Sequence, residues 1–378
     1  MSQTIGIHLG ERSFHLVAID GSLKKHKLVC AEAGEIPTGE GAAQLLTERL
    51  REIVKDNKLS ADSVYLAIDS GAAAFRNLTL PFDDRDKIEE VLKFEIEGNL
   101  PQYDIDQVVI DFLILSTKPG VESNLLVTAV PKDRLRAALT ICERAGLEAL
   151  EAELEGTALF DAAFETGILS DDAGTVLIHV GDTSTTVAVA DGRRLASLRA
   201  IRAGAYLAPG PAAADAVEDP AMEGPMAPKE AGEDPVLAPH ATEKERHLAS
   251  AQRIRRELLR TLSGARTTNE IKRVYLCGKD LPGLEGETLL DVPLQEMPFQ
   301  LGDATPAREF VIAFGAALRG FEGGTLTPRL RREELRFSGR MERLELPLAV
   351  FSLLLFTLLF VQYIVLDKQL EWRVEGNL

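Results

Sequence analysis

The chain has 378 residues, 45% of them hydrophobic, and is long enough for two domains or one large two-lobed fold with a packed core. Its formal net charge of −17 argues against a nucleic-acid partner, because phosphate binding requires a basic surface. The three cysteines, Cys30, Cys142 and Cys277, are too few and too far apart for a zinc site or a disulfide framework.

An ungapped internal repeat links the start of the chain to its middle. The segment 4–21, TIGIHLGERSFHLVAIDG, recurs at 175–192 as TVLIHVGDTSTTVAVADG, and seven of the eighteen positions are identical. Each copy is predicted to form a strand, a turn that begins at Gly10 or Gly181, and a second strand that ends at Asp-Gly. Two such units facing each other across a cleft can hold the phosphates of a nucleotide with backbone N–H groups. The repeat therefore predicts two related halves.

The first 200 residues are predicted to contain both strands and helices. Strands are predicted at 4–9, 14–19, 27–30, 64–68, 73–79, 107–115 and 124–130, and helices at 42–54 and 132–145. A further helix is capped by Asp83 or Asp84 and ends at Gly98-Asn99-Leu100-Pro101. A strand, a helix, a strand and a hairpin then continue to about residue 202.

Residues 204–240 differ in composition from what precedes them. They contain seven prolines, many alanines and mostly acidic charge, without apolar periodicity. Such a segment cannot bury enough apolar area to offset its ordering entropy, so we expect a disordered surface insertion, with a partner-binding tether as the alternative. Order resumes with a helix at 241–263, a strand at 273–277 and a last helix from Pro306 to Arg319.

The segment 346–366, LPLAVFSLLLFTLLFVQYIVL, carries no charge. At about 1.5 Å per residue it is long enough to cross a hydrocarbon core of about 30 Å. We therefore expect one transmembrane helix here, with a buried core helix as the alternative. No N-terminal signal peptide is expected, because residues 1–20 lack a basic region followed by an apolar one.

A basic juxtamembrane segment, 326–345, precedes the expected span. Its membrane-flanking arginines are Arg331, Arg332, Arg336, Arg340 and Arg343. By the positive-inside rule they place the large N-terminal domain in the cytoplasm and the C-terminus outside. Residues 367–378 are then the start of a periplasmic segment.

The repeat is accompanied by four further informative stretches, 80–112, 125–159, 273–284 (RVYLCGKDLPGL) and 308–320 (REFVIAFGAALRG). Together with the repeat, these stretches resemble the actin-like ATPase superfamily. More narrowly, the chain is similar to PilM and to the cytoplasmic domain of GspL. The segment from Thr327, TPRLRREELRFSGRMERLELPLAVFSLLL, is similar to the start of PilN, a short cytoplasmic peptide followed by one membrane helix.

The resemblance implies a two-lobed actin-like (ribonuclease H-like) α/β fold with a small inserted subdomain. The expected boundaries are 1–80 for lobe 1, 81–155 for the inserted subdomain and the return to lobe 1, and 156–325 for lobe 2. It further implies an inner-membrane platform protein of a type II secretion or type IV pilus machine. Its partners would be the assembly ATPase, other platform subunits, the bacterial inner membrane and a second copy of the chain.

The repeat departs from the nucleotide-binding members of the superfamily at one position in each copy, two residues before the turn glycine. Where those members have an aspartate that organises the Mg²⁺ waters, this chain has His8 and His179. Imidazole offers nitrogen, whereas Mg²⁺ prefers carboxylate oxygen. The residues left to form the cleft are Gly10, Ser13, Gly181, Asp182, Thr183, Ser184, Thr185 and Gly278.

Three interpretations of the cleft follow. In the first, the histidines pack at the ends of central strands and the fold persists without nucleotide, cofactor, metal or catalytic residue; this favours a non-enzymatic scaffold. In the second, ATP still binds through the Gly181–Thr185 turn, as in an actin-like ATPase. In the third, the two imidazoles hold a metal ion, although the sequence shows no third ligand. His15 and His26 are interpreted as incidental.

Overall fold

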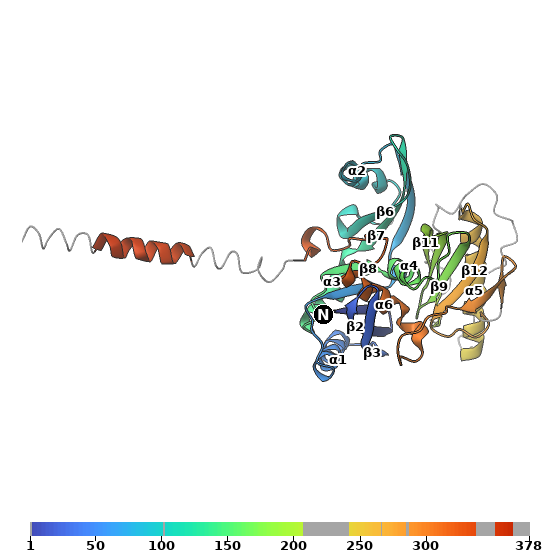
Figure 1. Ribbon diagram of the computed structural model, residues 1–378, viewed down its shortest axis with the longest axis horizontal. Helices are drawn as coiled ribbons and strands as arrows, with labels where there is room; N and C mark the ends of the chain where they lie inside the picture. The colour runs from blue at the N-terminus through green and yellow to red at the C-terminus, as the bar shows by residue number, and fades with distance from the viewer. Residues whose placement is uncertain are drawn as a thin grey trace, which may run out of the picture. The chain divides into compact units, whose positions relative to one another are not determined.

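Three β-sheets form the larger of two compact units of the chain, Met1–Arg331 (Figure 1). The computed structural model describes residues 2–100, 103–206, 242–265, 267–284, 287–337 and 352–365. Each large sheet contains one copy of the sequence repeat, and the third sheet is smaller.

The first sheet has the strand order β3-β2-β1-β4-β8. Its strands are β1 (Ser2–Leu9), β2 (Ser13–Ser22), β3 (Lys25–Glu35), β4 (Val64–Ile68) and β8 (Glu151–Leu154). The central strand β1 is antiparallel to β2 and parallel to β4, and the register places His8 opposite His15. Helices α1 (Ala42–Asp56) and α3 (Lys132–Arg144) belong to the same half of the unit and pack against each other.

The second sheet has the order β11-β10-β9-β12-β14-β13. Its strands are β9 (Gly174–Val180), β10 (Thr185–Asp191), β11 (Arg194–Ile201), β12 (Ile271–Gly278), β13 (Thr288–Leu289) and β14 (Val292–Glu296). Here β9 takes the place of β1, since it is antiparallel to β10 and parallel to β12. The prediction of two related halves is therefore confirmed. The long helix α5 (Glu243–Gly264) belongs to this half, and its buried Ile254 and Leu258 share a core with the sheet.

The third sheet, in the order β5-β7-β6, forms the small subdomain together with α2 (Arg85–Glu97). Its strands are β5 (Ala74–Leu80), β6 (Val108–Lys118) and β7 (Glu122–Pro131). The Asp84 side chain caps α2 by accepting from the N–H of Asp86, as the sequence predicts. The sheet begins at β5, so this subdomain includes residues that the sequence analysis assigns to lobe 1. The 3-10 helix η1 (Ser70–Ala72) turns the chain out of the first sheet before β5.

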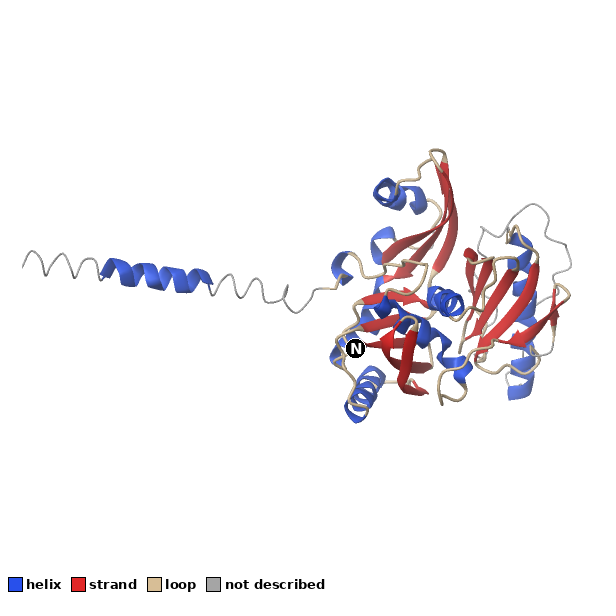
Figure 2. Ribbon diagram, viewed as in Figure 1, coloured by secondary structure: helices blue, strands red, loops and turns tan. Residues whose placement is uncertain are grey.

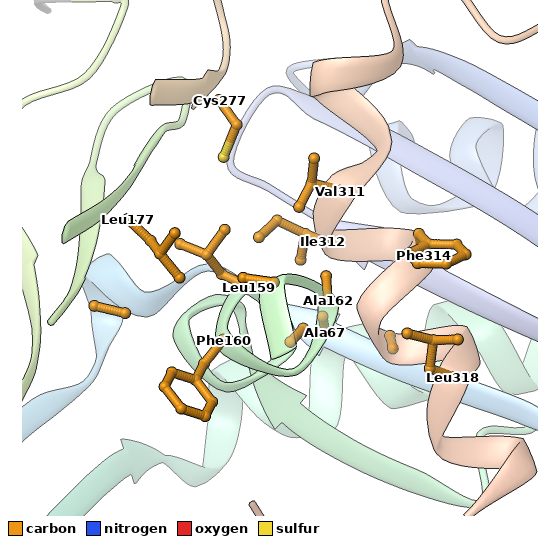
Figure 3. Close-up of a cluster of buried hydrophobic side chains, with 14 of the residues drawn as sticks. Ala67, Leu159, Phe160, Ala162, Leu177, Cys277, Val311, Ile312, Phe314 and Leu318 are labelled. Atoms are coloured by element: carbon orange, nitrogen blue, oxygen red, sulfur yellow. The ribbon is translucent and has the colours of Figure 1, made fainter. Parts of the chain in front are cut away.

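Two helices, α4 (Glu155–Glu165) and α6 (Val311–Leu318), join the two large sheets (Figure 2). Their buried side chains form one hydrophobic cluster with residues of both sheets, among them Ala67 and Leu177 (Figure 3). The helices approach closely at Gly315, where a Cβ would overlap the carbonyl oxygen of Ala158. The predicted helix from Pro306 to Arg319 differs at its start, because Ala307–Phe310 form the 3-10 helix η4.

The predicted insertion, 204–240, begins later than the composition indicates. Residues 204–206 belong to the folded unit, where Ala205 is buried and its N–H donates to the carbonyl of Gly181. The rest of the predicted insertion lies outside the described residues.

The second compact unit, Arg332–Leu378, contains the 3-10 helix η6 (Glu333–Leu335) and a helix over 352–365. The flanks of the predicted span 346–366 lie outside the described residues. Within the ranges that are described, no helix has both the length and the hydropathy needed to cross a bilayer.

Candidate functional site

The two repeat turns meet at a small cavity between the halves of the first unit. In each copy the turn closes with the same backbone hydrogen bond, from the N–H of Gly10 to the carbonyl of Ser13 and from Gly181 to Ser184, both at 2.9 Å. The cavity has about 10 Å³ for the centre of a water molecule, which is room for a single water. Its lining consists of His8, Gly10, Glu11, Ser13, His15, Asp69, Glu155, His179, Val180, Gly181, Asp182, Thr183, Gly278, Lys279 and Glu309.

Three histidines lie side by side in this cavity. His8 and His179 occupy equivalent positions near the ends of β1 and β9, and each is 2% exposed. The His8 ring stacks on that of His15 and meets that of His179 edge-on, with centroids 5.5 Å apart in both pairs. The interpretation of His15 as incidental is therefore wrong, because β2 pairs with β1 in the register that places it beside His8.

Burial keeps the central histidines uncharged. Desolvation, reinforced by the neighbouring His15, lowers the pKa of His8 to about 3. Desolvation likewise lowers the pKa of His179 to about 4, with His8 adding to the effect. Burial, followed by the neighbouring Glu155, raises the pKa of Asp69 to about 6. Near pH 7 both imidazoles are neutral, so each carries one N–H and one lone pair.

Glu155 is the central residue of the site, and the sequence analysis missed it. Its Oε1 lies 2.6 Å from His8 Nε2 and 3.8 Å from His179 Nδ1. Its Oε2 accepts hydrogen bonds from the hydroxyl of Thr186 at 2.8 Å and the N–H of Ser70 at 3.3 Å. The available signal was an acidic residue at the start of a helix whose residues 158–160 and 162–163 are apolar enough to be buried, although the same helix also contains Asp161.

Hydrogen bonds between the two halves occupy the polar groups of the turns. Asp182, from the second turn, accepts from the N–H of Arg12 at 3.0 Å and from the hydroxyl of Ser13 at 2.8 Å. The second turn also donates to the first half, since the Ser184 hydroxyl donates to Asp69 at 2.5 Å. Each turn therefore binds the opposite half of the same chain.

An ion pair borders the cavity on the side of β12. Lys279 donates to Glu309 at 3.0 Å, and His15 Nε2 lies 3.3 Å from the same carboxylate oxygen. Although burial alone would raise the pKa of Glu309, these partners hold it at about 2. Next to the lysine, Gly278 has φ of +85°, and a Cβ there would overlap the carbonyl oxygen of Val180.

The structure brings most of the predicted cleft residues together. Gly10, Ser13, Gly181, Asp182, Thr183 and Gly278 line the cavity with the two histidines. Thr185 does not line it, because its buried hydroxyl donates to the carbonyl of Ala203 at 2.7 Å. Ser184 does not line the cavity either, and its hydroxyl donates a hydrogen bond to Asp69.

The arginines expected beside the membrane fall in different parts of the chain. The Arg331 guanidinium donates to the carbonyl of Ala149 on the first unit. Arg332 and Arg336 belong to the second unit, where Arg336 is exposed. The remaining two, Arg340 and Arg343, lie outside the described residues.

Two sheets of matching strand order around a central cleft, with the repeat turns facing each other, define an actin-like ATPase fold. The family model described as type IV pilus assembly protein PilM matches residues 6–204, which is more than half of the chain. The chain therefore belongs to the PilM family. No curated protein matches the sequence significantly.

The solved structures that are similar to this chain differ widely from it in sequence. A PilM–PilN type IV pilus biogenesis complex is similar at 19% identity and a TM-score of 0.61, over 84% of this chain and 98% of that chain. The cytoplasmic domain of EpsL, an inner-membrane component of the type II secretion system of Vibrio cholerae, matches at 12% identity and a TM-score of 0.47. That match covers 88% of this chain and all of the other, 100%.

Proposed function

We propose that this protein is a non-enzymatic scaffold of a type IV pilus or type II secretion machine in the bacterial inner membrane. Its actin-like unit recruits the assembly ATPase, and its C-terminal helix links that ATPase to membrane and periplasmic subunits. Membership of the PilM family supports the assignment to this class of machine. The protein acts as a homodimer, as the resemblance to its family implies.

The proposal that the protein is not an enzyme rests on the residues and hydrogen bonds of the two repeat turns. A phosphate would need the backbone N–H groups of both turns and a cation held by nearby carboxylates. Here the N–H of Arg12 already donates to Asp182, and Asp69 accepts from Ser184. Imidazoles occupy positions 8 and 179, and the cavity has room for one water. These features favour a cleft that serves to hold the halves together.

Nucleotide binding without efficient hydrolysis is the rival function. It is favoured by the second turn, in which Gly181 and Thr183 line the cavity beside Lys279. A phosphate could enter only if Asp182 released its partners in the first turn.

Thermal unfolding of the full chain in detergent, with and without about 1 mM Mg²⁺-ATP, separates the two functions. A ligand present at a hundred times its Kd stabilises the folded state by about 2.7 kcal/mol, which is a shift of several degrees in Tm. We expect no shift. A shift of several degrees that Gly181→Arg abolishes would establish the rival.

The membrane link is supported by the helix over 352–365. Apart from Ser352, Thr357 and Gln362, its side chains are apolar, and they lie exposed on every side of the helix, among them Leu353 at 67%, Phe356 at 71% and Tyr363 at 66%. A helix that is apolar all round is stable only when it is buried in protein or lipid. We therefore assign 346–366 to the inner membrane, with the N-terminal unit in the cytoplasm.

The first unit holds the start of the PilN-like segment in place. Leu330 is 1% exposed, and its N–H donates to the carbonyl of Ala152 at 3.3 Å. The N–H of Arg329 donates to Asp111 of the small subdomain at 2.6 Å. This supports a fused plan, in which a segment like the PilN peptide docks on a PilM-like domain of the same chain.

Recruitment of the ATPase is tested by co-purification. The full chain, solubilised from membranes, should retain the assembly ATPase of its own organism without added nucleotide. Failure to retain it in detergent, while other platform subunits are retained, would contradict the recruiting role.

A further inference from the structure

Three side chains at the centre of the cavity converge on one point from three elements. They are His8 of β1, His179 of β9 and Glu155, the first residue of α4. One nitrogen or oxygen atom of each lies within 4.8 Å of the corresponding atoms of the other two, and all three residues are buried. The third ligand that the sequence did not show is therefore supplied by the fold.

The geometry leaves an unsatisfied nitrogen at the centre of this cluster. His179 Nδ1 is buried and has no hydrogen-bond partner among the described residues, and it lies 3.8 Å from Glu155 Oε1. That distance is too long for a hydrogen bond. Two ligands of a tetrahedral Zn²⁺ ion, each about 2.1 Å from the metal, are about 3.4 Å apart. A metal ion would thus occupy the space between these two atoms with small side-chain movements.

Glu155 is held in the orientation that a metal ligand needs. Its Oε2 accepts from Thr186 and Ser70, so Oε1 faces the two imidazoles. Such supporting hydrogen bonds fix ligand geometry in metal sites. On the other side, the hydrogen bond of 2.6 Å between His8 Nε2 and Glu155 Oε1 would have to lengthen by about 0.8 Å.

We propose that His8, His179 and Glu155 bind one Zn²⁺ ion, which links the two halves of the actin-like unit. Two imidazoles and one carboxylate are a known set of zinc ligands, whereas Mg²⁺ prefers an all-oxygen site. In such three-ligand sites the fourth position is taken by a water molecule. This inference does not depend on the proposed function, since a scaffold and a nucleotide-binding protein can both contain the site.

The test uses the full chain in detergent, without a histidine tag, after treatment with a chelator and dialysis. With added Zn²⁺ we expect one bound ion per chain by elemental analysis and an increase of several degrees in Tm. Co²⁺ in place of Zn²⁺ should give the visible absorption of a tetrahedral site. Less than half a Zn²⁺ ion bound per wild-type chain at saturating Zn²⁺ would by itself overturn the proposal.

Variants then locate the site. Glu155→Gln keeps the side-chain volume and should weaken Zn²⁺ binding by at least about 100-fold, since loss of even a supporting residue costs 10- to 100-fold. His179→Gln should weaken Zn²⁺ binding to the same extent. If circular dichroism shows that Glu155→Gln is unfolded, His179→Gln is used as the test in its place. The control is His247→Gln, a histidine of α5 that does not line the cavity, and it should leave the Zn²⁺ affinity unchanged. Wild-type affinity in both ligand variants would overturn the assignment.

Discussion

At the scale of single residues, the buried polar side chains of the first unit differ in how many of their atoms have a hydrogen-bond partner. Asp161 of α4 is fully buried, and its Oδ1 accepts from the N–H groups of Thr325 and Leu326 at 3.0 and 3.4 Å. Its Oδ2 has no hydrogen-bond partner among the described residues and lies 4.0 Å from Arg319 Nη1. Burial, followed by the neighbouring Glu153, raises the pKa of Asp161 to about 8.

This carboxyl should make stability depend on pH. Between about pH 4 and pH 8 the folded state holds a proton on Asp161 that the unfolded state has lost, so stability falls as pH rises through that window. Asp161→Asn keeps an oxygen for the two N–H donors and carries no charge. We expect the variant to be more stable than wild type at pH 8 by at least about 1.4 kcal/mol, the value of one pKa unit. The difference should shrink toward pH 4.

Denaturant unfolding at several pH values between 4 and 8 measures this difference. Asp56→Asn, an exposed position at the end of α1, is the control and should show a constant, small effect. A difference for Asp161→Asn that does not change with pH would contradict the raised pKa.

At the scale of elements, the packing of α6 on α4 decides how the sheets are joined. The strand and helix positions of the first half follow from local patterns, as the Asp84 cap and the bounds of β4 show. The helix α4 gave no such signal, because it is buried along almost its whole length, including its polar residues Glu155, Thr157 and Asp161. Consequently Glu155 could not be recognised from periodicity.

The close approach of these helices predicts a large effect of a small substitution. In Gly315→Ala the new methyl group would overlap the Ala158 carbonyl oxygen, and neither backbone can move without disturbing the core. We expect a loss of about 1–3 kcal/mol in the free energy of unfolding, measured with denaturant.

Gly98→Ala is the matched control for this substitution. Gly98 is exposed, has a helical φ of −66° and would meet no atom within 4 Å, so alanine should be neutral or stabilise by up to about 1 kcal/mol. Equal stability of the two alanine variants would show that α4 and α6 are not in contact at Gly315.

At the scale of the whole molecule, the proposed membrane helix fixes where the actin-like unit works. The full chain should sediment with the inner membrane and resist alkaline extraction, whereas a chain that ends at residue 345 should remain in the supernatant. The shorter chain should unfold at the same temperature, because its actin-like unit is unchanged. Recovery of the full chain in the alkaline supernatant would contradict a transmembrane segment.

The orientation of the proposed membrane helix is tested separately. A reporter that is active only outside the cytoplasm should be active when fused after Leu378, because Arg331, Arg332, Arg336, Arg340 and Arg343 retain the preceding side in the cytoplasm. Activity of a cytoplasmic reporter at the same point would reverse the topology.

The sequence by itself determined the two related halves and most strands and helices, because repeats, alternation and caps are local patterns. Its actin-like family followed from the resemblance to PilM and GspL. It also identified His8 and His179, two residues before the turn glycines, as the unusual residues of the repeat. Only the tertiary structure decided what surrounds them. Glu155 lies 147 residues from His8 along the chain and meets it at 2.6 Å. Residues so distant in sequence come together only when the sheets pack through α4, which local propensity cannot specify.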